Sequence, residues 1–82
     1  MVEGIYEYIE MNLVAATEKT ETYAVRNRES QLVLGYVKWN CGWRQYCFYP
    51  EGETTYSKGC LMDICDFICK LMYERRNNER NG

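Results

Sequence analysis

The sequence predicts an α+β domain, with a four-stranded antiparallel meander sheet and one C-terminal helix packed across a face. Up to Tyr49, segments rich in β-branched and aromatic residues alternate with short polar turns, a pattern typical of sequential antiparallel strands. After Pro50, apolar residues recur at helical spacing. We expect residues 1–75 to form a single domain and residues 76–82, which contain no apolar residue, to form a disordered polar tail.

The first two strands are predicted at residues 5–14 and 20–27. In residues 5–14, apolar residues fall mainly at odd-numbered positions, and such alternation along the chain indicates a strand. Ile5, Ile9 and Leu13 also recur every four residues, so a helix is the alternative. Thr, Tyr and Val residues favour an extended chain in 20–27, and the turn residues of 27–30 should close a hairpin.

The third strand is predicted at residues 31–39, the most apolar part of the sheet, and should be central. Gly35 lies in its middle and weakens a strand unless another side chain needs the room. We therefore expect a large ring over Gly35, from Phe48 or from the helix.

A turn at Asn40-Cys41-Gly42 leads into the fourth strand, residues 43–49. A two-residue turn at Cys41-Gly42 would place three pairs on the core face: Trp39 with Arg44, Val37 with Tyr46 and Gly35 with Phe48. A three-residue loop would instead pair Trp39 with Trp43 and set Arg44 beside Lys38. Because like charges directly opposite each other are unfavourable, we prefer the two-residue turn.

Pro50 should end the fourth strand, since it cannot donate to the ladder. Ser57 is a suitable N-cap for a helix that runs to about Arg75. The residues expected to lie on the sheet are Leu61, Ile64, Phe67, Ile68, Leu71 and Met72.

Composition argues against several classes of protein. Ten basic and twelve acidic residues give a net charge of −2, which disfavours coating of nucleic acid or an anionic membrane by bulk charge. The five cysteines are an odd number, and the first residues lack the pattern of a signal peptide, so we expect a cytoplasmic protein with reduced thiols. No apolar run approaches the roughly 20 residues that span a bilayer, so we expect no membrane partner.

No catalytic, cofactor or metal site is predicted. The chain has no His, the residue most often used for acid–base chemistry at neutral pH, and no phosphate-binding glycine motif. Cys60 lies well round the helix from Cys65 and Cys69, so these thiols form no four-ligand zinc set. We expect a protein that is not an enzyme and that holds no cofactor or metal.

One predicted binding surface is basic and aromatic. Rings on a sheet could stack on the bases of single-stranded DNA or RNA while cations contact phosphates. The candidate residues are Arg26, Arg28, Tyr36, Lys38, Trp43 and Arg44. The alternative is structural, because Arg44 over Trp39 would equally be a cation–π pair that closes one end of the core.

The other predicted surface is a helix flank made by Met62, Cys65, Cys69 and Tyr73, which widens the apolar stripe beyond the need of one sheet. Met and Tyr are enriched at protein interfaces, so we assign partner binding to Met62, Cys69 and Tyr73. A second copy, a groove in a host or phage protein, or a longer sheet could cover this flank.

The chain resembles a family of small uncharacterised proteins of phages, prophages and bacteria. The resemblance covers residues 20–72 and rests on Leu34-Gly35, Lys38-Trp39, Trp43-Arg44-Gln45-Tyr46-Cys47-Phe48 and the helix from Cys60 to Ile68. It implies no activity, but small phage proteins without catalytic residues often regulate host machinery by binding. We therefore predict a non-catalytic protein-interaction module that modulates a host protein, with a small nucleic-acid-binding protein as the alternative.

Overall fold

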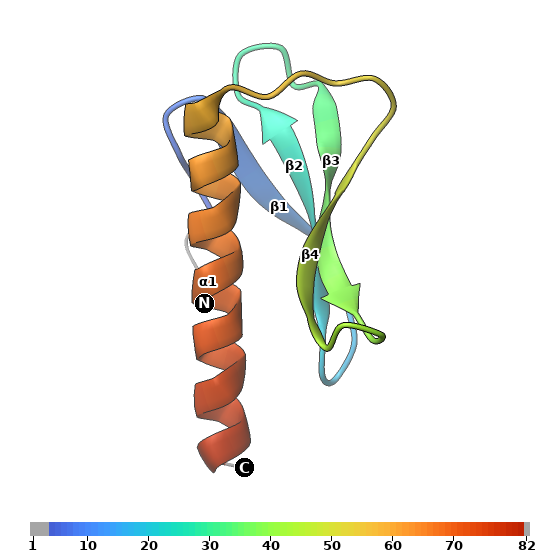
Figure 1. The fold of residues 1–82 in the computed structure, drawn as a ribbon, viewed down its shortest axis with the longest axis vertical. Helices are drawn as coiled ribbons and strands as arrows, with labels where there is room; N and C mark the ends of the chain where they lie inside the picture. The colour runs from blue at the N-terminus through green and yellow to red at the C-terminus, as the bar shows by residue number, and fades with distance from the viewer. Residues whose placement is uncertain (1–3, 82) are drawn as a thin grey trace.

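The computed structural model describes residues 4–81, and the side chains of residues 4–77. Four strands and one helix follow in the order β1 (Ile9–Ala16), β2 (Glu21–Asn27), β3 (Val33–Asn40), β4 (Gln45–Pro50) and α1 (Lys58–Asn81). The strands form one antiparallel sheet in the order β1-β2-β3-β4, and α1 stands against one face of it (Figure 1). The predicted α+β fold is confirmed.

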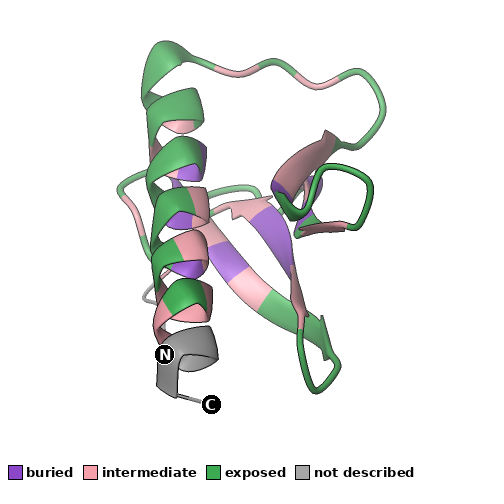
Figure 2. Ribbon diagram, turned by 60° about the horizontal axis from the view of Figure 1, so that its bottom comes forward, coloured by how far each residue is buried: buried purple, intermediate pink, exposed green. Residues whose placement is uncertain are grey.

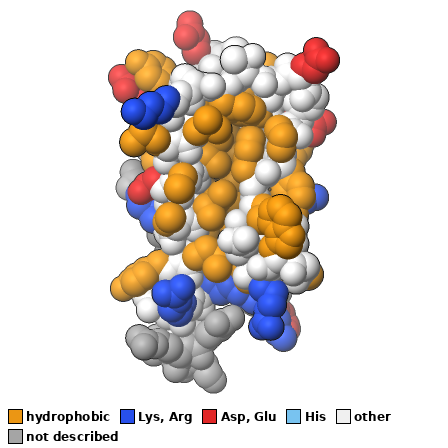
Figure 3. All heavy atoms as spheres, in the orientation of Figure 1, with side chains coloured by type: hydrophobic (Ala, Val, Ile, Leu, Met, Phe, Trp, Pro, Cys, Tyr) orange, Lys and Arg blue, Asp and Glu red, His pale blue; other side chains and the backbone are white. Residues whose placement is uncertain are grey.

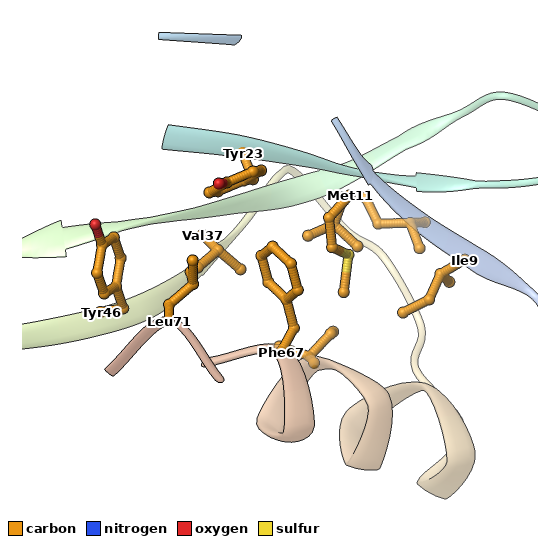
Figure 4. Close-up of a cluster of buried hydrophobic side chains, with 10 residues drawn as sticks. Ile9, Met11, Tyr23, Val37, Tyr46, Phe67 and Leu71 are labelled. Carbon is orange, nitrogen blue, oxygen red and sulfur yellow. The ribbon is translucent and has the colours of Figure 1, made fainter. Parts of the chain in front are cut away.

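Phe67 is the centre of the core between α1 and the sheet. Its side chain is fully buried and points from the helix toward Tyr23, with ring centroids 4.9 Å apart and planes at 85° (Figure 4). Ile64 and Leu71, one turn away on either side, are also buried, as the helical spacing predicted. Figure 2 shows the buried residues of α1 and of the strands facing each other.

The N-terminal segment contains a strand, so the alternative of a helix at residues 5–14 is wrong. The strand begins at Ile9 rather than Ile5, because the chain before it folds back on β1. The N–H of Tyr6 donates to the carbonyl of Ile9 at 2.9 Å, and that of Met11 donates to Gly4 at 2.7 Å. This local turn places Ile5 in an isolated bridge with Glu10.

The turn between β2 and β3 has the predicted chemistry. The side-chain oxygen of Asn27 accepts from the backbone N–H groups of Glu29 and Ser30, at 2.9 and 3.0 Å. The left-handed residue is Gln31, with φ of 66°, and β3 therefore begins at Val33, two residues later than predicted.

The predicted register of β3 and β4 is wrong by two residues. The observed pairs are Trp39 with Tyr46, Val37 with Phe48 and Gly35 with Pro50. The connecting loop contains residues 41–44, where Asn40 Oδ1 accepts from the N–H of Trp43 at 2.9 Å and Arg44 is left-handed, with φ of 55°. Neither the two-residue nor the three-residue turn is formed. Because the error is an even number of residues, the predicted faces are still correct.

The helix begins as predicted but is longer. Ser57 Oγ accepts from the N–H of Cys60 at 3.2 Å, which confirms the N-cap. The helix continues past Arg75 to Asn81, so its predicted end is wrong, whereas disorder of residues 76–82 stays a prediction. Leu61 does not lie on the sheet, because it is about 120° round the helix from Phe67 and 51% exposed.

Gly35 has no room for a side chain, as predicted. A Cβ there would lie 2.5 Å from the carbonyl oxygen of Tyr49 and 2.7 Å from the ring of Phe48. We expect Gly35→Ala to lower the free energy of unfolding by about 1–3 kcal/mol, because backbone and a packed ring must both shift. Urea unfolding followed by tryptophan fluorescence measures this.

The matched control is Gly59→Ala, where the new methyl group would meet only Ser57 Oγ, at 3.8 Å. It should leave stability unchanged or raise it by up to about 1 kcal/mol. Equal stabilities of the two variants would contradict the close approach at Gly35.

Candidate interaction surfaces

The predicted flank of α1 is exposed to solvent. Met62 and Tyr73 are 60% and 67% exposed, and Cys65 and Cys69 are exposed between them. Leu61 lies beside them and adds to the apolar area. The assignment of partner binding to Met62, Cys69 and Tyr73 stays a prediction.

Cys65 and Cys69 lie one helical turn apart and form a thiol pair in the middle of this flank. The charge of Cys65 raises the pKa of the Cys69 thiol, and a hydrogen bond between the two side chains adds to the effect. Within residues 4–77, no three His, Cys, Asp or Glu side chains are grouped so that they could hold a metal ion. The two thiols therefore lie side by side on an exposed, apolar part of the helix.

A polar cluster limits the flank on one side. Asp66 accepts hydrogen bonds from the Tyr6 hydroxyl at 2.8 Å and forms an ion pair with Lys70 at 2.9 Å. The bond from Lys70, followed by that from Tyr6, holds the pKa of Asp66 below its usual range. These contacts tie the segment before β1 to the helix.

The residues of the basic aromatic prediction do not form one surface. Tyr36 and Lys38 lie on the sheet face opposite α1, where Lys38 Nζ is 4.5 Å from the ring centre of Tyr49. Asn40 Nδ2 donates to the Tyr49 hydroxyl at 3.0 Å. This face therefore holds a small cluster of rings with a single lysine.

Arg26 also lies on this face, because it follows the core residue Val25 and shares a face with Ala24, the partner of Tyr36. The other cations and Trp43 lie elsewhere. Arg28 donates to the carbonyl of Tyr6 at 2.7 Å and so holds the N-terminal turn in place. Arg26 lies opposite Glu10 in the register of β1 and β2, and its guanidinium donates to the carbonyl of Gln31 at 3.4 Å. Trp43, 71% exposed, and Arg44 lie in the loop between β3 and β4.

Trp39 forms a structural cation–π pair, but with a different cation from the predicted Arg44. The guanidinium of Arg75 lies 3.9 Å from the centre of the Trp39 ring and donates to the carbonyl of Lys19. Trp39 in turn packs edge-on against Tyr46, with centroids 5.3 Å apart. Arg75 was missed because the helix was predicted to end there; its position about 80° from Phe67 on the helix would have indicated a place near the core.

Two hollows flank Arg75. The larger, of about 510 Å³, lies by the turn between β1 and β2 and is lined by residues 17–21, Tyr46, Leu71, Glu74 and Arg75. Burial raises the pKa of Tyr46, which lines this hollow. It also raises the pKa of Tyr23, whose hydroxyl donates to Glu21 of the lining at 3.0 Å. The smaller, of about 150 Å³, is lined by Trp39, Arg44, Met72, Arg75 and Arg76.

The chain is similar to a known phage protein. It is 36% identical over 59 residues to the uncharacterised 9.3 kDa protein of Acholeplasma phage L2, an alignment that covers 72% of this chain and 76% of the phage protein. The chain therefore belongs to the same family of small, uncharacterised phage-associated proteins. No family model matches it, and no solved structure matches it.

The expected link to phages is thus confirmed. The only helix in residues 4–81, α1, is not apolar enough to cross a membrane.

The thiol pair gives a test of whether any cysteine of the helix is activated. The thiolate is the reactive form, so the raised pKa of Cys69 should make this residue slow to alkylate at neutral pH. In Cys65→Ala, the neighbour that raises the pKa of Cys69 is removed, and Cys69 should react faster. Pulsed iodoacetamide labelling with peptide mass spectrometry measures the alkylation rate of Cys69 in the unsubstituted protein and in Cys65→Ala. Labelling of Cys69 that is faster in the unsubstituted protein than in Cys65→Ala would contradict the pairing.

Proposed function

We propose that this protein is a non-catalytic protein-interaction module that binds a host protein and modulates it. The observation that carries the proposal is the apolar flank of α1, where Met62 and Tyr73 are more than half exposed on the same helix whose other side forms the core. A helix that is apolar over so wide an arc usually packs against two partners.

The flank has enough apolar surface to drive association. Burial of a side chain such as Leu or Met contributes about 1.5–3 kcal/mol, and Leu61, Met62 and Tyr73 each expose half or more of their surface. Exposed apolar patches on small proteins commonly mark binding sites. Two partners suit this surface: a groove in a host or phage protein, or the flank of a second copy in a homodimer.

The relationship to a phage protein supports a role as a stoichiometric regulator or inhibitor that acts in the cytoplasm of the host. We propose that the string Trp39-x-x-x-Trp43-Arg44-Gln45-Tyr46-x-Phe48 is a signature of the family. Trp39, Tyr46 and Phe48 pack against the core, which gives these positions a structural reason to be retained.

A small nucleic-acid-binding protein is the second candidate. The cluster of Tyr36, Lys38 and Tyr49 on the open sheet face favours it, because rings and a cation lie together where a single strand could stack. This candidate is the weaker one, because Arg28 is engaged with the carbonyl of Tyr6 and Arg44 lies in the loop between β3 and β4, whereas backbone binding needs cations along one groove.

Two substitutions test the flank directly. We expect Met62→Asp and Tyr73→Asp to abolish self-association, or capture of a partner from host lysate, because each places a charge in the apolar contact. The helical circular dichroism should be unchanged, since both side chains are exposed in the free protein. Sedimentation velocity and affinity capture are the measurements.

Leu32→Asp is the matched control, because Leu32 is 59% exposed and lies in the turn before β3. It should retain every association of the unsubstituted protein. Retained association in both helix variants, or equal loss in the control, would contradict a binding role for the flank.

A further inference from the structure

A second apolar surface lies where α1 faces β4. We call it the seam, and it consists of hydrophobic residues that are only partly covered by the core: Trp39, Phe48, Tyr56, Cys60, Ile68 and Met72. Figure 3 shows hydrophobic side chains gathered between the helix and β4, with Lys and Arg side chains at the lower end. The linker from β4 to α1 passes over the upper end (Figure 1).

The edge of β4 along the seam carries main-chain groups that point away from the sheet. The N–H of Tyr46 faces the helix and donates to Met72 Sδ at 3.4 Å, whereas the N–H of Glu51 faces β3 and donates to the carbonyl of Leu34 at 2.9 Å. Successive residues of an antiparallel strand point their backbone N–H and C=O groups to opposite sides of the strand. The N–H and C=O of Phe48, two residues after Tyr46, therefore also face the seam. Pro50 has no N–H, so the bonding edge is short and centred on Phe48.

The lower end of the seam is cationic. The hollow of about 150 Å³ has Trp39 and Met72 as apolar lining and three arginines around them, Arg44, Arg75 and Arg76. No carboxylate of the described side chains lines it. Arg75 is engaged with Trp39 and Lys19, whereas Arg44 and Arg76 are exposed. A negatively charged group would complement this end.

We infer that the seam binds an extended, acidic segment of a partner protein. The segment would add to the edge of β4 through Phe48, place alternate apolar side chains against Phe48 and Ile68, and set a carboxylate between Arg44 and Arg76. A polypeptide fits better than a nucleic acid, because the strand edge presents an N–H and a C=O that match another backbone. The inference rests on the proposed function and specifies a surface and a chemistry for the partner.

The test uses a displayed library of random decapeptides selected on the folded protein. Selected peptides should carry Asp or Glu at one end of an alternating apolar stretch. Binding of the best synthetic peptide should weaken about tenfold in Arg44→Glu/Arg76→Glu, since each charge-assisted contact becomes a repulsion. Lys38→Glu/Lys58→Glu makes the same change in net charge away from the hollow and should leave affinity unchanged.

Hydrogen exchange locates the bound peptide on the strand edge. Exchange of the Phe48 amide should slow on binding, whereas that of Cys47, which already faces β3, should not change. Failure to select any peptide, selection without acidic residues, or affinity unaffected by Arg44→Glu/Arg76→Glu would overturn the inference.

Two outcomes separate this inference from the proposed function. In the first, peptides bind Arg44→Glu/Arg76→Glu with unchanged affinity and fail to bind Tyr73→Asp. This outcome would overturn the seam as the peptide-binding site and leave the helix flank as the interaction site. Binding of a twenty-nucleotide oligothymidine, lost in the arginine variant and accompanied by no selected peptide, would assign the arginines to phosphate and overturn both proposals.

Discussion

The packing of Phe67 against Tyr23 is the contact on which the rest of the structure depends. One helix has to cover a four-stranded sheet, and it does so through a ring that is fully buried and stands edge-on to the ring of β2. Loss of such a ring typically costs about 3–5 kcal/mol, a large fraction of the stability of a small domain. The orientation of Phe67 therefore determines which side of α1 faces the core and which side faces solvent.

The two proposed binding surfaces follow from that orientation. With Phe67, Ile64 and Leu71 on the sheet, the flank at Met62 and Tyr73 is left without a covering element. The end of the helix is held by Arg75, which lies on Trp39, and this contact brings the neighbouring Arg76 near Arg44. A single helix thus supplies the core, an apolar flank and part of a cationic hollow, which suits a small protein that acts by binding.

The sequence was sufficient for features set by local chemistry. Alternation, strand-favouring residues and turn residues predicted the strands, and Ser57 predicted the start of the helix. Gly35 predicted a large ring above it, from Phe48 or from the helix, and the ring is that of Phe48. It was insufficient where a loop or a distant contact decides the outcome. The left-handed Arg44 lengthened the β3–β4 loop and moved the register by two residues, and the cation over Trp39 came from residue 75, on the far end of the chain. The cationic hollow was missed for the same reason.

Photo-crosslinking in host cells tests the central claim, that this protein acts through the exposed side of α1 and not through its open sheet face. A benzophenone amino acid would replace Tyr73 in one variant and Lys38 in another. Both positions are exposed, the first on α1 and the second on the sheet face opposite α1. The account predicts discrete protein adducts from position 73, with a second copy or a host protein, and none from position 38. Adducts only from position 38, or adducts with nucleic acid, would contradict it.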